Sequence, residues 1–327
     1  MRAMGYSEFG GAEDVLNPHM LPTPDPAPGE VLVELRCSGV NPSDVKARAG
    51  ARPGVPKPPF PLIIPHSDGA GVVVKTGDGV DESRIGRRVW IWNGQWQRAF
   101  GTCATHICLP APQVVDMPED VQFETGAQLG IPGLTAAHAV FAAGPVAGKR
   151  VLINGAAGTV GYLATQLAVW GGAHVVATAR GTGIERVKDA GAHHVMAYSS
   201  DELATQIRET GGPIDHVVEV EFGVNADLIS DVIAENGSIC AYGSAKNMRP
   251  VIPFYPLMFK AVTLHIALIY LLQPDLRNAA ITRLHKALAC DALSVPVAQI
   301  YDLSRAASAH DSVMAGARHG GILVACA

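Results

Sequence analysis

The sequence lacks an excess of positive charge. It contains 25 Lys and Arg against 30 Asp and Glu, which gives a formal net charge of −5 at pH 7. No run of basic residues forms a stripe along the chain, and recognition of a nucleic-acid backbone depends on clustered cations. We therefore expect that nucleic acid is not a partner.

Long uncharged apolar runs are also missing. A helix that crosses a bilayer needs roughly 18 or more such residues, whereas the longest candidate, AVTLHIALIYLL, is too short and contains His265. The first residues, MRAMGYSEFGG, have no apolar core of the kind that a secretory signal carries. The sequence therefore predicts no membrane partner and a cytoplasmic location.

Closely paired cysteines are absent as well. The 6 cysteines show no CxxC spacing, so neither a disulfide framework nor a zinc ribbon is indicated. We expect free thiols.

The chain does contain enough apolar residues for two cores. At 327 residues and 48% hydrophobic composition, it exceeds the size at which a single core usually stops growing. The first part of the chain carries short β-branched runs, EVLVELRCSG, AGVVVKTG, RRVWIW and THICLPA, separated by Pro and Gly. These runs predict a mostly antiparallel, barrel-like β domain.

The second part of the chain has a different texture. Short apolar runs, KRVLING, HVVATAR, DHVVEV and GSICAYG, alternate with stretches of helical length such as GYLATQLAVWGG. This alternation predicts an α/β fold with a doubly wound parallel sheet. The last run, GGILVACA, needs a strand to pair with, so we expect the C-terminal tail to return to the first domain and complete it.

A glycine-rich loop gives the most specific functional signal. In KRVLINGAAGTVGYLATQLAVW a buried strand leads through the loop directly into a helix, which is the context of a pyrophosphate-binding turn. Gly155 permits the tight turn, Gly158 lets backbone amides approach phosphate, and Gly161 lets helix and strand pack closely. The loop residues predicted to bind cofactor are Gly155, Ala156, Gly158, Thr159, Val160 and Gly161.

The end of the next strand indicates which dinucleotide binds. An NAD site usually places an acid there to bind the ribose hydroxyls, but HVVATARGT contains none. Thr178, Arg180 and Thr182 occupy the turn instead, and a guanidinium flanked by hydroxyls suits a 2′-phosphate. The sequence therefore predicts NADPH, although Arg180 can also be a solvated surface charge.

Several motifs in the same order resemble the zinc-independent quinone oxidoreductases, the zeta-crystallin group of the medium-chain dehydrogenase/reductase superfamily. They are GVNPSDVKARAG, PHSDGAGVV, GTCATHICLPA, LGIPGLTAAHAV, NGAAGTVG and GGILVACA. The resemblance implies a GroES-like catalytic domain at 1–124 and 270–327, with a Rossmann NADPH-binding domain at 125–269 between its parts. It also implies a homodimer joined at Rossmann edge strands, for which TLHIALIYLL is the candidate seam.

The resemblance adds site residues to those of the glycine-rich loop. It places Asn41 at the nicotinamide end of the cleft, and we take Asn41, Asp44 and Ser67 as candidate catalytic residues. Asn41 can instead stabilise its loop, and Asp44 can orient its neighbours or cap a helix. Further cofactor-binding residues implied by the resemblance are Asn41, Thr135, Tyr198, Gly243, Ser244, Ile266 and Leu268.

The motif PHSDGAG raises the question of a metal. Aligned by glycines with zinc-dependent relatives, the chain has Asn41, Ser67 and Ile131 at the ligand positions, and none of these is a good zinc ligand. His66 lies one residue away from a ligand position. We therefore expect no metal, and an architectural role for His66, Ser67 and Asp68.

The expected reaction follows from these features. Without a Lewis acid the hydride acceptor must already be electrophilic, which favours reduction of quinones or related conjugated carbonyls. An enone, alkenal or enoyl-thioester double-bond reductase is the nearest alternative, and a non-catalytic nucleotide-binding or RNA-binding protein is the alternative from another class. Glu219 and Glu221, in a loop that usually reads Asp-x-Val-Gly, and Gly321, where many relatives have lysine, depart from the family pattern.

Overall fold

The computed structural model describes residues 1–52, 54–316 and 318–327. The chain divides into two compact units. Unit 1 comprises Met1–Ile131 and Val295–Ala327, and unit 2 comprises Pro132–Ser294. The expected division had the same discontinuous pattern, with boundaries at 124 and 270. The second junction lies later because the helix α10 (Pro274–Ala289) packs on α4 (Leu134–Phe141) within unit 2.

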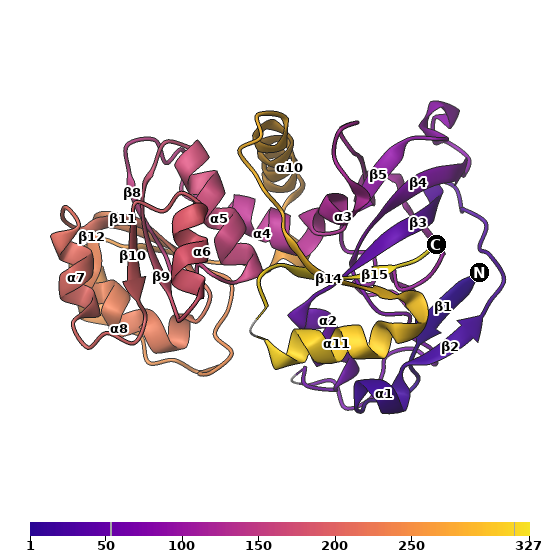
Figure 1. Ribbon diagram of the computed structural model, residues 1–327, viewed down its shortest axis with the longest axis horizontal. Coiled ribbons are helices and arrows are strands. Elements are labelled where there is room, and N and C mark those ends of the chain that lie inside the picture. Colours follow the sequence, from indigo (N-terminus) through magenta and orange to yellow (C-terminus); the bar gives the residue numbers. More distant parts are fainter. Residues whose placement is uncertain (53, 317) are drawn as a thin grey trace. The chain divides into compact units, whose positions relative to one another are not determined.

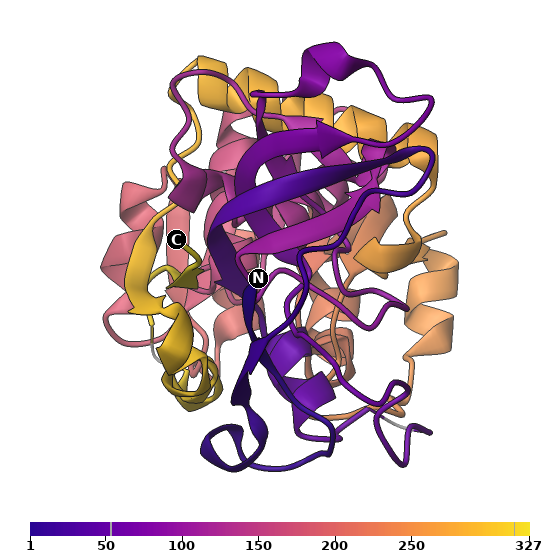
Figure 2. The ribbon, with the colours of Figure 1, turned by 90° about the vertical axis from the view of Figure 1, so that its right-hand side faces the viewer.

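Unit 1 is built on one curved sheet whose strands follow the order β14-β15-β3-β4-β5-β7, with β6 also paired to β3. Figure 2 shows the C-terminal strands in yellow beside the indigo and purple strands of the N-terminal part. The strands are β3 (Glu30–Val40), β4 (Asp68–Thr76), β5 (Arg88–Ile91), β6 (His106–Pro110), β7 (Val114–Asp116), β14 (Val297–Asp302) and β15 (Gly321–Ala325). The C-terminal strand β15 pairs antiparallel with β3, which confirms the expected return of the tail.

Unit 1 also contains a second, two-stranded sheet and several short helices. The strands β1 (Arg2–Gly5) and β2 (Asn17–Met20) pair antiparallel with each other. The other elements are α1 (Ala12–Val15), α2 (Pro42–Arg48), η1 (Glu82–Arg84), η2 (Ala111–Gln113), α3 (Phe123–Gly126), η5 (Leu303–Arg305) and α11 (Ala306–Ala315), with η3 (Leu129–Gly133) at the junction. The helix α11 packs on α1 and α2, so this C-terminal helix shares a core with the N-terminal residues.

Unit 2 is a parallel sheet in the order β10-β9-β8-β11-β12-β13. Its strands are β8 (Arg150–Ile153), β9 (His174–Ala179), β10 (His194–Ala197), β11 (Ile214–Glu219), β12 (Ile233–Ala241) and β13 (Thr263–Ile266). Figure 1 shows α5 (Thr159–Trp170) and α6 (Gly183–Asp189) on one face, with α7 (Leu203–Glu209) and α8 (Phe222–Val232) on the other. The helix α9 (Phe254–Phe259) and the turn η4 (Ile269–Leu271) flank β13.

This arrangement explains the near-continuous apolar strands of unit 2. Val151, Leu152 and Ile153 in β8 are all fully buried, because helices cover both faces of a doubly wound sheet. The predicted α/β fold class, a GroES-like unit and a Rossmann unit, is confirmed.

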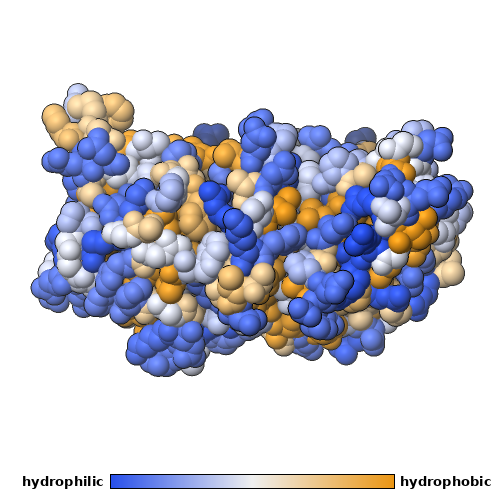
Figure 3. Space-filling model, turned by 90° about the horizontal axis from the view of Figure 1, so that it is seen from above, coloured by the Kyte–Doolittle hydropathy of each residue, from blue (hydrophilic) through white to orange (hydrophobic). Residues whose placement is uncertain are grey.

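The face of the molecule drawn in Figure 3 carries mostly hydrophilic side chains, interrupted by small hydrophobic patches. Among the described residues, no helix combines the length and apolar character that crossing a membrane requires.

Candidate functional site

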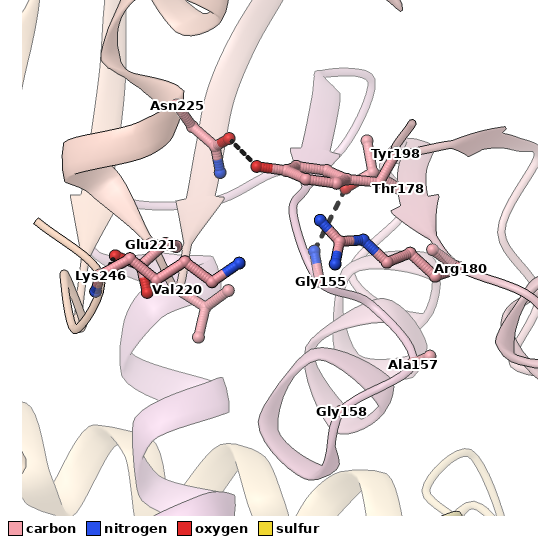
Figure 4. A pocket seen from close by; sticks show the side chains of 11 residues that line it. Gly155, Ala157, Gly158, Thr178, Arg180, Tyr198, Val220, Glu221, Asn225 and Lys246 are labelled. Atoms are coloured by element: carbon pink, nitrogen blue, oxygen red, sulfur yellow. Dashed lines mark hydrogen bonds between the residues drawn. The ribbon is translucent and has the colours of Figure 1, made fainter. Parts of the chain in front are cut away.

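An open pocket of about 330 Å³ lies in unit 2 where the central parallel strands end. Ligands of doubly wound sheets bind at this edge. Residues at the ends of several of these strands line the wall, as Figure 4 shows. The lining residues are Gly155, Ala157 and Gly158 after β8, Thr178, Ala179 and Arg180 at β9, Tyr198 after β10, Val220 and Glu221 after β11, Asn225 in α8, and Lys246.

The glycine-rich loop has the geometry that its sequence predicted. Gly155 has φ 67°, the left-handed conformation that glycine adopts without strain. Gly158 lines the pocket and is the N-cap of α5, where no side chain caps the helix. A Cβ on Gly161 would lie 2.5 Å from the oxygen of Gly155, which explains why this position needs glycine. Helix starts of this kind bind phosphate groups.

A guanidinium forms a second positive feature of the pocket. Arg180 lies over the ring of Tyr198, with Cζ 4.4 Å from the ring centroid. Tyr198 in turn donates from its hydroxyl to Oδ1 of Asn225 at 2.9 Å, as Figure 4 shows. The cation–π contact and this hydrogen bond fix the direction of Arg180, which lines the pocket.

Beneath the pocket, a buried carboxylate connects three of the strand ends. Glu219 is fully buried and accepts hydrogen bonds from Nδ2 of Asn154 at 2.6 Å and Nδ2 of Asn225 at 2.9 Å. Asn154 also accepts from the hydroxyl of Thr178. Burial raises the pKa of Glu219, and these donors oppose the shift. Glu219 therefore positions residues that hold the pocket wall and does not face a ligand.

The structure brings only some of the predicted cofactor residues to this pocket. Gly155, Gly158, Thr178, Arg180 and Tyr198 line it. Those that lie elsewhere, and whose cofactor role stays a prediction, are Asn41, Thr135, Ala156, Thr159, Val160, Gly161, Thr182, Gly243, Ser244, Ile266 and Leu268.

The structure shows the surroundings of four of these predicted cofactor-binding residues. Thr135 lies inside α4, whose N-cap is Gly133, so it does not cap that helix. Ile266 and Leu268 are 83% and 50% exposed at the edge of the sheet. Ser244 accepts from the backbone of Gly223.

Sequence reasoning missed six lining residues: Ala157, Ala179, Val220, Glu221, Asn225 and Lys246. The first four adjoin predicted strand ends, so their neighbourhood was a usable signal. Asn225 and Lys246 reach the pocket from a helix and a loop, and no local pattern in the sequence distinguishes them.

The candidate catalytic residues of unit 1 belong to a buried polar cluster. Asn41 is the N-cap of α2, and it forms a capping box with Asp44. Its Nδ2 donates to Oδ2 of Asp68 at 2.8 Å, while Oδ1 of Asp68 accepts from the amide of Ile131 at 2.8 Å. Burial raises the pKa of Asp44 to about 7 and that of Asp68 well above its ordinary value. Asn41, Asp44 and Ser67 are all buried. Their catalytic roles stay predictions.

A chain of hydrogen bonds runs through the neighbouring side chains. Thr102 donates its hydroxyl proton to the carbonyl of Asp68, so the hydroxyl of Ser38 donates to Thr102 at 2.7 Å. The Oγ of Ser38 then accepts from Nδ1 of His66 at 2.8 Å. This leaves Nε2 of His66 as the acceptor for Nε2–H of His310, at 2.9 Å. These bonds occupy both ring nitrogens of His66, which has φ 76°, and its architectural role stays a prediction.

The three positions aligned with zinc ligands do not suit zinc. The amide of Asn41 is bonded to Asp68, Ile131 has a hydrocarbon side chain, and Ser67 is a poor ligand. Within residues 1–52, 54–316 and 318–327, no group of three or more His, Cys, Asp or Glu side chains is arranged to hold a metal.

Comparison with known proteins identifies the family. The family described as "Alcohol dehydrogenase GroES-like domain" matches residues 27–147, and the family described as "Zinc-binding dehydrogenase" matches residues 159–286. A quinone oxidoreductase of Rattus norvegicus is 33% identical over 236 residues, which cover 71% of this chain and 69% of the relative. A chloroplastic quinone-oxidoreductase homolog of Spinacia oleracea is 32% identical over 246 residues, covering 73% and 74%.

A solved structure supports the same assignment. A mycobacterial protein in complex with NADPH has 27% sequence identity and a TM-score of 0.85, with 99% of this chain and 100% of that chain covered. The matches span both units. The chain belongs to the quinone oxidoreductase group of the medium-chain dehydrogenase/reductase superfamily and is an oxidoreductase of that type.

Proposed function

We propose that this protein is an NADPH-dependent reductase that transfers a hydride to quinones or related conjugated carbonyls without a metal. The observation that carries the proposal is the pocket of unit 2, which offers two separate anion contacts. One is the start of α5 at Gly158, and the other is Arg180 at the end of β9. A dinucleotide with a pyrophosphate and a 2′-phosphate needs two such contacts.

The preference for NADPH rests on the turn after β9. This turn presents Arg180 and no carboxylate, and Tyr198 holds the guanidinium in place. Guanidinium groups bind phosphate through paired, charge-assisted hydrogen bonds. When bound, NADPH supplies the hydride, and the residues of the pocket supply its binding and orientation. A mycobacterial neighbour that was solved with NADPH supports this choice.

The proposed class of hydride acceptor follows from the side chains at the three positions aligned with zinc ligands. The positions aligned with zinc ligands do not suit the metal, so polarisation of an alcohol or simple ketone by a Lewis acid is not provided there. A quinone or conjugated carbonyl accepts hydride without that help. The rate enhancement then comes from holding the cofactor and the acceptor close together in the correct orientation. Relatives named quinone oxidoreductase support the choice of acceptor.

An acceptor panel tests this function. Purified protein should oxidise NADPH when benzoquinone or phenanthrenequinone is the acceptor. With NADH in place of NADPH the reaction should be about tenfold less efficient, which corresponds to about 1.4 kcal/mol of lost binding free energy. Turnover should survive treatment with a chelator. Faster reduction of an alkenal or crotonyl-CoA than of any quinone would favour the double-bond reductase instead. Failure of every acceptor although NADPH binds, or loss of turnover on chelation, would contradict the proposal.

The same proposal includes a homodimer formed through unit 2. The strand β13 is the edge of its sheet, and Phe254 and Phe259 in the adjacent α9 are 63% and 78% exposed. An apolar sheet edge pairs readily with another chain. Ile266→Lys should convert a dimer into a monomer in light-scattering measurements, because the ammonium would be buried in the seam.

Ile300→Lys is the matched control, since it changes an exposed isoleucine of unit 1 and should leave the dimer intact. A wild-type protein with the mass of one chain would disprove this part of the proposal. The cytoplasmic location expected from the sequence stays a prediction.

A further inference from the structure

An acidic residue lines the pocket that we propose binds the phosphate groups of NADPH. Glu221 lines the pocket together with Arg180 and the glycine-rich loop. A carboxylate directed at the ligand would repel phosphate, and it would suit the ribose hydroxyls of NAD instead. The contacts of Glu221 therefore decide whether it opposes the proposed cofactor preference.

Both oxygens of this carboxylate are bound to the protein backbone. Oε1 of Glu221 accepts from the amide of Lys246 at 2.8 Å, and Oε2 accepts from the amide of Ala245 at 3.1 Å. Hydrogen bonds to two amides direct much of the carboxylate's accepting capacity toward the loop. Glu221 is thus an anchor for the loop at residues 244–247.

Further contacts tie the same loop to the start of α8. The amide of Gly223 donates to Oγ of Ser244 at 2.9 Å, and Nδ2 of Asn247 donates to the carbonyl of Gly223 at 3.3 Å. A Cβ on Gly223 would meet the carbonyl oxygen of Asn247 at 2.4 Å, so this close approach depends on glycine. The loop is held from both ends, with Lys246 between them.

The side chain of Lys246 is the part of this loop that enters the pocket. Figure 4 shows Lys246 and Arg180 extending toward each other from opposite sides. Lys246 lines the pocket, and within the part of the chain that the structure describes no carboxylate forms an ion pair with its ammonium. A second cation therefore faces the space that Arg180 enters.

We propose that Lys246 is a phosphate-binding residue of the cofactor pocket and that Glu221 is the positioning residue that holds it there. This inference rests on the proposed function, because it specifies how the same pocket selects a phosphorylated dinucleotide. The acid at the end of β11 then supports NADPH binding through the loop, with its own charge turned toward backbone amides. Lys246 contacts either the 2′-phosphate or the pyrophosphate, and these are separable by experiment.

Direct titrations with NADPH, NADH, 2′,5′-ADP and ADP test the proposal. Lys246→Met should weaken NADPH binding by about tenfold or more, as expected for loss of one charge-assisted hydrogen bond. It should also reduce the slope of affinity against salt concentration. A loss confined to NADPH and 2′,5′-ADP assigns the contact to the 2′-phosphate, whereas an equal loss for NADH and ADP assigns it to the pyrophosphate.

Two controls separate this role from a structural one. Lys246→Arg should restore most of the affinity, and Lys188→Met, which removes a charge from an exposed pair with Glu185 in the same unit, should have no effect. NADPH binding by Lys246→Met at wild-type affinity would overturn the inference and leave the proposed function intact. Absence of NADPH binding by the wild-type protein would instead refute the proposed function.

The role of Glu221 requires a double-mutant cycle. Glu221→Gln should weaken NADPH binding several-fold, but it should add nothing in the Lys246→Met background, because the anchor acts only through the lysine. Additive losses, or a loss of NADH binding alone, would show that Glu221 contacts the ligand itself and would overturn its assignment as the positioning residue.

Discussion

Replacing Gly161 by alanine is expected to destabilise unit 2 by about 3 kcal/mol or more and to abolish NADPH binding. The added Cβ would lie 2.5 Å from the oxygen of Gly155 and 2.7 Å from Cα of Ala156. Both atoms belong to the backbone of the turn and cannot move without opening it. Alanine favours a helix over glycine by only about 1 kcal/mol, so the clash dominates. Urea unfolding and NADPH titration measure the two effects.

Gly158 provides the matched substitution in the same loop. Its φ is −71°, and the nearest atom to an added Cβ is the oxygen of Gly155 at 3.4 Å. Gly158→Ala should therefore keep its unfolding free energy within about 0.5 kcal/mol of the wild type. It should still weaken NADPH binding, because the methyl group lies where phosphate approaches the start of α5. Equal stability of the two variants would show that the close contact at Gly161 is relieved without cost.

The comparison between these glycines shows what the sequence could predict. The order of strand, glycine-rich loop and helix is local, so the roles of Gly155 and Gly161 followed from spacing and backbone conformation alone. The return of the C-terminal strand was also predictable, since an isolated apolar strand must pair with a neighbour. These features depend on short segments whose patterns carry their own structural requirements.

Other features depend on contacts between distant segments. The loop that carries Lys246 is bound by Glu221, which lies 25 positions earlier in the sequence, and His310 meets His66 across 244 positions. The boundary expected at 270 was placed too early, because nothing within α10 itself indicates that it packs on α4. Sequence reasoning gave Asp68 only an architectural role, and its hydrogen bonds to Asn41 and Ile131 required the fold.

Removing the imidazole of His310 is expected to protect the protein against acid. Burial, followed by the charge of Arg48, lowers the pKa of His310 to about 3, from an ordinary value of about 6.5. The unfolded chain therefore binds a proton first as the pH falls, so stability present above pH 6.5 is lost between that value and about 3. At pH 5 the loss from this residue is about 2 kcal/mol.

His310→Gln retains an amide donor for Nε2 of His66 and removes the titrating ring. Its unfolding free energy relative to the wild type should rise by about 2 kcal/mol between pH 7.5 and pH 5, measured by urea unfolding at each pH. The difference between the proteins is the informative quantity, because the raised pKa values of Asp44 and Asp68 act in the opposite direction. Those carboxyl groups hold protons in the folded state that the unfolded state releases, so their contribution to stability increases as the pH falls.

The pH dependence of the unfolding free energy of His310→Gln can also be separated from any effect of poorer packing. Poorer packing of glutamine against His66 would lower stability by the same amount at every pH, whereas the effect of protonation grows below pH 6.5. Below this pH the imidazole of His66, whose pKa burial and His310 also lower, should still make the variant acid-sensitive to a smaller degree. His19→Gln makes the same replacement outside the buried cluster and should follow the wild-type curve. Parallel curves for wild type and His310→Gln would mean that folding leaves the pKa of His310 unchanged, which would contradict the prediction.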